Sequence, residues 1–294
     1  MYQEPVSSAK MNAVEARTLQ NGGIPLYCMT DGAPDDPLVV LLHGFPARWS
    51  TWRQTMTPLA HAGFYVAAPD LRGYGQSAKP EGVRSYTIDR LVDDVTHVVH
   101  ELGKDSAFIV GHDFGGGVAW ATAMLRPGVV KAVAILNAVH PVGFEQRIRY
   151  RSQLVRSWYI FFFQIPWLPE LLLVQGDFRM VRRSLSKDGL PPETIADLLE
   201  GVRPAGALTA AVNWYRAVFR DGLKKRFQPR TVDVPALIVW GDRERYLDPE
   251  LADPPPGWVS QVRVEHLPDA SHWVHHDAPD RVASLLIDHF AALV

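Results

Sequence analysis

Short apolar runs rich in β-branched residues alternate along the chain with segments in which apolar residues recur at helical spacing. This alternation is typical of a mostly parallel sheet that is covered by helices on both faces. The predicted strands are residues 25–29, 38–42, 65–68, 107–110, 132–136, 236–240 and 261–266. The predicted core helices are residues 49–62, 88–102, 117–126 and 278–293.

The pattern changes between about residues 140 and 230, where Trp, Phe, Tyr and Arg become frequent and no strand is predicted. We predict that residues 140–230 form a helical cap on a core made of residues 1–139 and 231–294. The most apolar stretch, residues 158–174, contains two prolines and two polar residues, so we expect no spanning helix and no stable membrane insertion.

The composition narrows the classes of function. The 294 residues are 47% hydrophobic and 21% charged, which indicates a globular protein with a full core. A formal net charge of −2 argues against a nucleic-acid partner. The single cysteine, Cys28, excludes an internal disulfide and a cysteine-based metal cluster. The polar N-terminus lacks the apolar region of a signal peptide, so we expect a cytoplasmic protein. Arginine outnumbers lysine, which favours a bacterial source.

The pentapeptide Gly-His-Asp-Phe-Gly at residues 111–115 carries the most informative chemistry. It follows an apolar strand and precedes a glycine pair that leads into a helical pattern, as in a nucleophile elbow. Its central residue is Asp113, where serine or cysteine would serve acyl transfer. A carboxylate that attacks saturated carbon gives an ester that water can cleave, whereas a serine would give an inert ether. Asp113 therefore predicts substrates with an electrophilic sp³ carbon, such as epoxides or alkyl halides.

An elbow of this kind needs an acid and then a histidine later in the chain. The turn after strand 236–240 contains three candidate acids, Asp242, Glu244 and Asp248. Carboxylates at the carboxyl end of a sheet strand face the crevice in which ligands bind. His272 lies in a turn after the last predicted strand, where its imidazole can reach Asp113. We expect the neighbouring His275 and His276 to begin a helix.

The sequence His43-Gly44-Phe45-Pro46 follows strand 38–42. Gly44 permits a close approach of the backbone. The N–H groups of Phe45 and Phe114 can then form an oxyanion hole. A Gly-Pro turn without a catalytic role is the alternative, and the isomer of the peptide bond before Pro46 stays open.

A glycine-containing loop at residues 70–77 follows strand 65–68. Its glycines permit tight turns, and Asp70 and Arg72 can pair with each other. We interpret this loop as structural.

The motifs HGFP at 43–46, GHDFGG at 111–116 and SHWV at 271–274 together resemble those of the α/β-hydrolase fold, and within it the epoxide hydrolases. The resemblance implies an α/β protein with a mostly parallel eight-stranded sheet, flanking helices and an inserted helical cap. The segments WYIFFFQ at 158–164 and NWYR at 213–216 resemble those that carry two cap tyrosines in this family. The resemblance implies that Tyr159 and Tyr215 are these two cap tyrosines.

One position departs from the family's pattern. The family's acid is usually an Asp three residues after the glycine that ends the strand. Here that glycine is Gly241, and Glu244 stands three residues later. We assign the acid to Glu244, and Asp248 and Asp242 stay open as alternatives.

The resemblance implies a two-step reaction that needs no metal or organic cofactor. Asp113 attacks the epoxide while Tyr159 and Tyr215 donate to its oxygen. His272, oriented by Glu244, then activates the water that cleaves the ester.

The aromatic residues of the cap favour a bulky hydrophobic or aryl epoxide as the small-molecule substrate. The predicted substrate-binding residues are Trp158, Phe162, Trp214, His43 and Pro46. The oligomeric state stays open, a homodimer included.

Two other functions compete with this interpretation. Haloalkane dehalogenases share the Asp–His chemistry but usually carry Trp after the nucleophile and Asn after the first His-Gly, where this chain has Phe114 and Phe45. A non-catalytic receptor on the same scaffold would tend to lose a triad member or the glycine of the oxyanion loop, and Asp113, His272 and Gly44 are all present.

Overall fold

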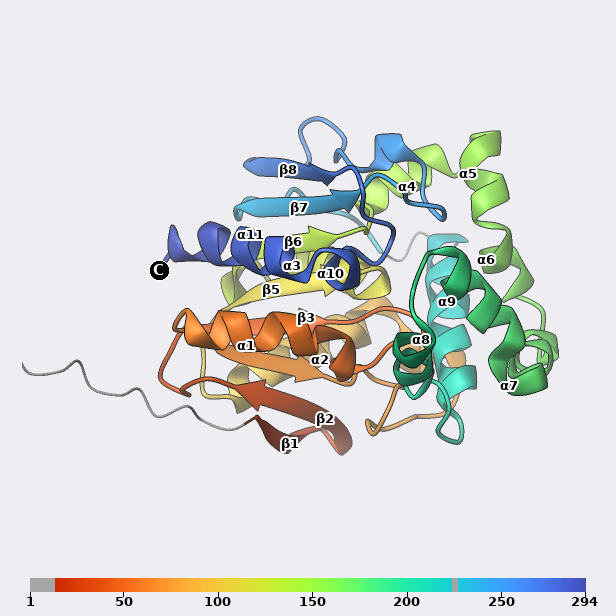
Figure 1. Cartoon of the computed structure of the whole chain (residues 1–294), viewed down its shortest axis with the longest axis horizontal. Coiled ribbons are helices and arrows are strands. Elements are labelled where there is room, and N and C mark those ends of the chain that lie inside the picture. The colour runs from red at the N-terminus through yellow and green to blue at the C-terminus, as the bar shows by residue number, and fades with distance from the viewer. Residues whose placement is uncertain (1–13, 224–226) are drawn as a thin grey trace, which may run out of the picture.

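A computed structural model describes residues 14–223 and 227–294 of the chain. Its strands form one eight-stranded sheet in the order β1-β2-β4-β3-β5-β6-β7-β8 (Figure 1). The strands are β1 (Glu15–Asn21), β2 (Ile24–Asp31), β3 (Leu38–Leu42), β4 (Tyr65–Pro69), β5 (Ala107–His112), β6 (Val130–Leu136), β7 (Ala236–Gly241) and β8 (Val262–Leu267). Strand β2 pairs antiparallel with β1 and β4, and all other pairs are parallel. The predicted fold class is confirmed.

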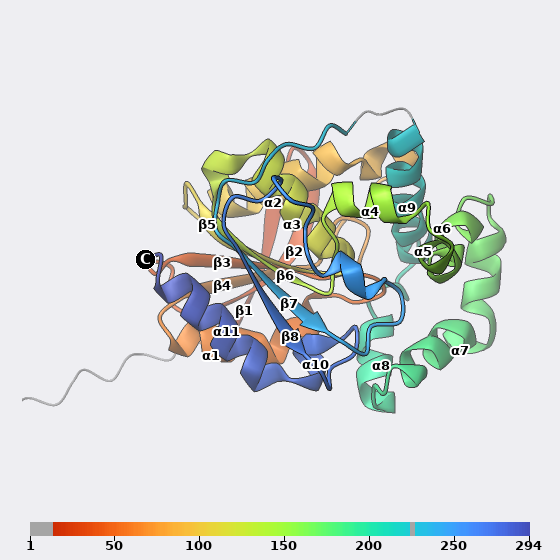
Figure 2. The same cartoon turned by 90° about the horizontal axis from the view of Figure 1, so that it is seen from above.

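Helices cover both faces of the sheet, and a second group lies beyond one end of it (Figures 1 and 2). The α-helices are α1 (Arg53–His61), α2 (Ile88–Glu101), α3 (Phe114–Leu125), α4 (Pro141–Arg147), α5 (Arg151–Arg156), α6 (Trp158–Phe162), α7 (Leu168–Lys187), α8 (Pro192–Leu199), α9 (Ala207–Leu223), α10 (Val274–Asp277) and α11 (Pro279–Ala291). Short 3₁₀ turns are η1 (Trp49–Trp52), η2 (Val83–Tyr86), η3 (Pro127–Val129) and η4 (Pro249–Leu251).

Strand β3 shows why the central strands read as continuous apolar runs. Leu38, Val40 and Leu42 pack into the core that includes residues of α2 and α3. Val39 and Leu41 point to the opposite face and pack with residues of α1 and α11. Successive side chains of a strand alternate between faces, and here both faces are buried, so every position is apolar.

The sequence pattern misses strand β1 and misplaces two helix starts. Only Leu19 of β1 is buried, because this strand is the exposed edge of the sheet and lacks an apolar face. Helix α3 begins at Phe114, immediately after the elbow, and not at residue 117. The predicted helix 49–62 is a 3₁₀ turn, η1, followed by α1.

Helices α4 to α9 lie beyond the carboxyl ends of the parallel strands, toward which the arrowheads of the strands point (Figure 1). They fall within the predicted cap, residues 140–230, and the described part of that range contains no strand. Residues 224–226 of this range lie outside the described residues. None of the helices in the described ranges is long and apolar enough to cross a membrane.

The loop after β4 corrects one predicted contact. Arg72 does not pair with Asp70 but with Asp94 of α2, through bonds of 2.7 and 2.5 Å. The carboxylate of Asp70 instead accepts from the backbone N–H groups of Trp49 and Gln76, at 2.9 and 2.8 Å. Asp70 therefore holds its own loop to η1, as a structural residue.

Candidate active site

Asp113 stands at the tip of the turn between β5 and α3, in a backbone conformation that few residues adopt. Its φ of 51° and ψ of −123° place it outside the regions that L-residues favour. Such strain persists only where the surrounding structure enforces it, and it is concentrated at functional sites. A Cβ at Gly115 would collide with the carbonyl oxygens of Leu42 and His43, so glycine is required for this close packing. The turn presents the carboxylate of Asp113 at the carboxyl edge of the sheet.

The carboxylate of Asp113 is bound by backbone N–H groups. The N–H of Phe45 donates to its Oδ2 at 2.9 Å. Burial raises the pKa of Asp113, while His272 and hydrogen bonds from the N–H groups of Phe45 and Phe114 lower it. The side chain is 23% exposed, so it faces open space on one side. The two N–H groups are those that the sequence predicted for an oxyanion hole.

The loop that supplies the Phe45 N–H is held by His43. Burial lowers the pKa of His43 to about 4, so its imidazole is neutral. Its Nε2 accepts from the N–H of Leu71 at 2.9 Å, and its Nδ1 lies 3.0 Å from the carbonyl oxygen of Gly44. A Cβ at Gly44 would collide with the carboxylate of Asp113. The peptide bond between Phe45 and the buried Pro46 is cis.

His272 lies between two carboxylates. Its Nδ1 is 2.6 Å from Oε2 of Glu244, and its Nε2 is 3.9 Å from Oδ1 of Asp113. Of the three candidate acids, the structure therefore brings Glu244 to the imidazole. Asp242 bonds to the exposed His266 at 2.6 Å. Asp248 pairs with arginines of α4 and α5 and accepts from Ser152.

The charged forms of His272 and Glu244 stabilise each other. Burial alone would lower the pKa of His272, but the charge and hydrogen bond of Glu244, with the charge of Asp113, raise it to about 9. Burial would raise the pKa of Glu244, yet His272 and two further hydrogen bonds hold it below its usual value. The imidazolium therefore favours the charged form of each carboxylate and each carboxylate favours the imidazolium, whereas the charge of Glu244 raises the pKa of Asp113.

Two polar residues that the sequence analysis did not identify hold this arrangement. Asn137, at the end of β6, donates to Oε2 of Glu244 at 2.8 Å and accepts from the N–H of Gly241 at 2.9 Å. His112 precedes the nucleophile, and its Nε2 lies 2.9 Å from the carbonyl oxygen of His272. Polar residues at the carboxyl ends of strands are the signal that could have found both.

The other two histidines of the turn have structural partners. His275 and His276 lie in α10, as expected, and their Nε2 atoms lie 2.8 and 2.7 Å from the hydroxyl of Thr51.

Tyr159 of α6 and Tyr215 of α9 lie beside the nucleophile on the cap side. Their ring centroids are 5.9 Å apart, and the ring of Tyr215 lies 5.1 Å from that of Phe114. Burial and the charge of Asp113 raise the pKa of both phenols, so both hydroxyls stay protonated. Within the described ranges, neither hydroxyl makes a hydrogen bond to the protein. Both can therefore donate to a bound molecule.

The surroundings of the nucleophile are aromatic. Phe163, which the sequence analysis did not assign to substrate binding, packs against Phe45 and Tyr215, with ring centroids 6.2 and 5.0 Å apart. The ring edge of the buried Trp214 lies against Phe114, while its indole N–H donates to the carbonyl of Arg72. These rings form apolar walls next to the charged groups.

Trp158 lies on the exposed side of α6, whereas Phe162 packs partly against the main core. Trp158 is 54% exposed, and its ring lies 5.9 Å from that of the half-buried Phe162. The structure therefore does not bring Trp158 to the nucleophile.

Tyr246, two residues after Glu244, joins the acid loop to the cap. Its N–H donates to Oε1 of Glu244 at 2.7 Å, and its ring lies 5.1 Å from that of His272. Its hydroxyl donates to Asp188 at 2.6 Å and lies 2.9 Å from the hydroxyl of Ser184. Asp188, at the end of α7, is buried and also pairs with Arg245 at 2.7 Å. We call Tyr246 and Asp188 with Arg245 the cap–acid-loop clamp.

The arrangement combines a buried carboxylate, an imidazole that is held by a second carboxylate, a pair of backbone N–H groups and two phenol hydroxyls. Among the described residues, no group of three or more His, Cys, Asp or Glu side chains is placed to hold a metal ion. These parts suit displacement at carbon followed by ester hydrolysis.

Comparisons with known proteins show to which family the chain is similar. The model of the α/β-hydrolase fold family matches residues 37–279. The AB hydrolase superfamily protein YfhM of Bacillus subtilis is 35% identical over 284 residues, which are 95% of this chain and 99% of that protein. Epoxide hydrolase 4 of Homo sapiens is 32% identical, covering 91% of this chain and 76% of its own length.

A solved structure extends the similarity to three dimensions. The crystal structure of a Bacillus megaterium epoxide hydrolase with an inhibitor superposes with a TM-score of 0.84 at 26% identity, covering 94% of this chain and all of the other. The motifs, the fold and these matches lead to one conclusion: the chain belongs to the α/β-hydrolase fold family, and within it to the epoxide hydrolases.

Proposed function

We propose that this protein opens an epoxide to a vicinal diol through an ester on Asp113. The observation that carries the proposal is the carboxylate at the tip of the elbow, next to two tyrosine hydroxyls that have no other partner in the described structure. A carboxylate supplies the nucleophile, and two neutral donors suit an oxygen that becomes strongly basic as the ring opens. Helices α4 to α9 act as a cap that supplies these donors.

In the first half-reaction, Oδ1 of Asp113 attacks a ring carbon from behind. The C–O bond of the ring breaks, and its electron pair remains on the epoxide oxygen, which takes a proton from Tyr159 or Tyr215. The Phe45 N–H donates to Oδ2, and we assign the attack to Oδ1, the oxygen that faces His272. The product of this half is an alkyl ester of Asp113.

In the second half-reaction, His272 takes a proton from water, which attacks the carboxyl carbon of the ester. Ester formation removes the charge of Asp113, one of the charges that raise the pKa of His272. The pKa of the imidazole therefore falls once the ester has formed, which increases the fraction of neutral His272 that can act as a base. Glu244 orients it, and the N–H groups of Phe45 and Phe114 bind the oxyanion of the intermediate.

We propose a hydrophobic, aryl-bearing epoxide as the preferred substrate class. Phe45, Phe114, Phe163 and Trp214 surround the nucleophile with apolar rings, which favour burial of a flat apolar group. We assign a positioning role to His43, which holds the loop of the Phe45 N–H.

A paired assay tests the reaction. The purified protein is incubated with aryl and alkyl epoxides and, separately, with haloalkanes and haloacids. Diol formation without halide release is the expected result, with aryl epoxides turned over faster than short polar ones. Halide release without diol would instead identify a dehalogenase. Tight binding of an epoxide without turnover would indicate a receptor.

The two tyrosines are expected to act in ring opening alone. Tyr159→Phe and Tyr215→Phe should each slow ester formation roughly 10²-fold, because one donor to the leaving oxygen is lost. Hydrolysis of the ester should stay within a few-fold of the wild type, as measured by single-turnover kinetics. Tyr150→Phe, at an exposed cap tyrosine, is the matched control and should change neither step. Slower hydrolysis with normal ester formation would contradict this role.

The cap–acid-loop clamp is expected to set the pH dependence of ester hydrolysis. The negative charge of Asp188 contributes to the raised pKa of His272. Asp188→Asn should therefore lower that pKa and shift the midpoint of hydrolysis, which needs neutral His272, to lower pH. Tyr246→Phe keeps the charge and should lower the rate with a smaller shift of the midpoint.

The control for the clamp is Asp177→Asn, which removes an exposed carboxylate of the same helix that pairs with Arg182 and Arg203. The pH profile of ester hydrolysis in this variant should match that of the wild type. If Asp188→Asn only lowered the rate and left the midpoint in place, the clamp would be structural and would not tune His272.

A further inference from the structure

Helices α5, α6 and α7 and the turn between α6 and α7 expose many large apolar side chains. Trp167 is 74% exposed, and Val155 and Trp158 are 63% and 54% exposed. Further exposed apolar residues of this part of the chain are Leu154, Phe161, Ile165, Leu171, Leu172, Val174 and Met180. Large exposed apolar patches on soluble proteins mark surfaces that bind a partner or a membrane. We call these exposed residues the outer cap face.

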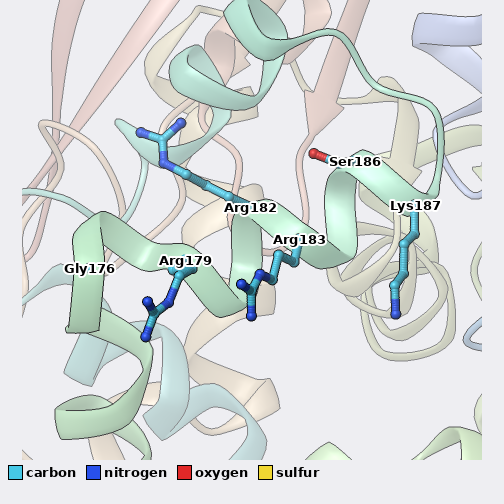
Figure 3. Close-up of a pocket in the computed structure, with 6 residues that line it drawn as sticks. All are labelled: Gly176, Arg179, Arg182, Arg183, Ser186 and Lys187. Atoms are coloured by element: carbon cyan, nitrogen blue, oxygen red, sulfur yellow. The ribbon is translucent and has the colours of Figure 1, made fainter.

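A kink at residues 175–178 divides α7, and the part that follows the kink adds a row of cations. Arg179, Arg183 and Lys187 are exposed and follow one another at intervals of four residues. Residues at this spacing lie on the same side of a helix. Figure 3 shows these three side chains on one side of the helix, whereas Arg182 points to the other side. Met180 stands between Arg179 and Arg183 in sequence and is also exposed.

The acidic residues of these helices do not neutralise this row. Glu170 pairs with Arg216, and Asp177 pairs with Arg182 and Arg203. Asp188 is buried in the cap–acid-loop clamp. No ion pair of Arg179, Arg183 or Lys187 occurs in the described part of the chain, so their charges face solvent.

We propose that the outer cap face docks on the surface of a membrane that contains anionic lipids. Exposed Trp, Phe and Leu side chains beside Lys and Arg are the combination that binds the interfacial region of a bilayer. Each basic residue near an anionic bilayer adds to the attraction between the protein and the lipid. A homodimer formed through this face would instead bring the cations of the two copies together. Docking places the cap next to the lipid bilayer, in which hydrophobic epoxides accumulate.

Vesicle sedimentation tests the proposal on the full-length protein. One set of vesicles contains phosphatidylcholine alone, and the other contains phosphatidylcholine with phosphatidylglycerol. The wild type should sediment with the mixed vesicles and should bind the neutral ones far less. Arg179→Glu/Arg183→Glu/Lys187→Glu should bind the mixed vesicles at least about 100-fold more weakly, because three attractive charges become repulsive. Its epoxide turnover in solution should equal that of the wild type.

The matched control changes the same net charge elsewhere. Lys104→Glu/Arg126→Glu/Lys131→Glu alters residues next to the amino ends of β5 and β6, away from the cap, and should lose less than a few-fold in binding. Trp167→Ser/Leu171→Ser should also weaken binding, since the apolar contact is lost. Equal binding to both kinds of vesicle would overturn the proposal. So would a dimer in light scattering that the Trp167→Ser/Leu171→Ser variant converts to a monomer.

Discussion

Replacing Asp113 by alanine is expected to lower diol formation at least about 10⁴-fold. The alanine variant has no group that can form the ester, and the remaining donors cannot activate water at the ring carbon by themselves. Loss of one member of a catalytic triad commonly leaves only the contribution of binding and of the oxyanion hole. The measurement is the steady-state kcat/KM for an aryl epoxide, with circular dichroism to show that the variant is folded.

Asp242→Ala is the matched control for this experiment. Asp242 bonds to the exposed His266 and does not contact the imidazole of His272, so its loss should change kcat/KM less than about threefold. If Asp113→Ala kept a tenth of the wild-type activity, the ester mechanism would be wrong, and direct attack by water would take its place.

The second large effect is expected for His272→Gln, which should form the ester and fail to hydrolyse it. Ring opening needs Asp113 and the tyrosines, whereas hydrolysis needs a base at position 272. The intact protein should therefore gain the mass of one substrate molecule, with release of diol slowed at least about 10⁴-fold. Mass spectrometry of the protein after mixing with epoxide measures the adduct directly.

The pH dependence of this adduct follows from the charges around Asp113. Burial raises the pKa of Asp113, and the charge of His272 lowers it. Without the imidazolium the pKa of Asp113 rises, so ester formation in His272→Gln should have its midpoint at higher pH than in the wild type. His266→Gln, at an exposed histidine, should accumulate no adduct. A His272→Gln protein that turned over normally would contradict the role of His272.

The fold could be predicted from the sequence because its central strands are buried on both faces. In β3 every residue is apolar and buried, so the run of hydrophobic residues marks the strand directly. Strand β1 has no such signal, since Glu15, Arg17 and Asn21 lie along an edge that faces solvent. Edge strands are defined by their backbone pairing, which leaves little trace in the side chains.

The candidate site also has a part that could be predicted from sequence and a part that could not. The elbow, the Phe45 loop and the turn of His272 are local motifs, so their residues could be named from sequence. The partners that hold them come from distant segments: Asn137 reaches Glu244 across 107 positions, and Tyr246 reaches Asp188 across 58. The pairing of Arg72 with Asp94 was missed for the same reason, because nothing local distinguishes Asp94 from Asp70.

Trp158 and Phe163 show that the orientation of a short aromatic helix could not be predicted from sequence. Both belong to one aromatic run, and five positions separate them. The rotation of α6 turns Trp158 to solvent and Phe163 toward Phe45 and Tyr215. A short helix of this composition has no polar face that would reveal its orientation, so sequence alone could not tell which ring lines the site.

The hydrogen bond from the Phe45 N–H to Oδ2 of Asp113 makes the two carboxylate oxygens unequal. In the proposed mechanism only Oδ1 leaves with the diol, and the oxygen from water takes its place. Over many turnovers in water enriched in ¹⁸O, the enzyme should therefore exchange one carboxylate oxygen of Asp113 and retain the other. The isotopic composition of a single peptide would then record whether the carboxylate ever rotates between cycles.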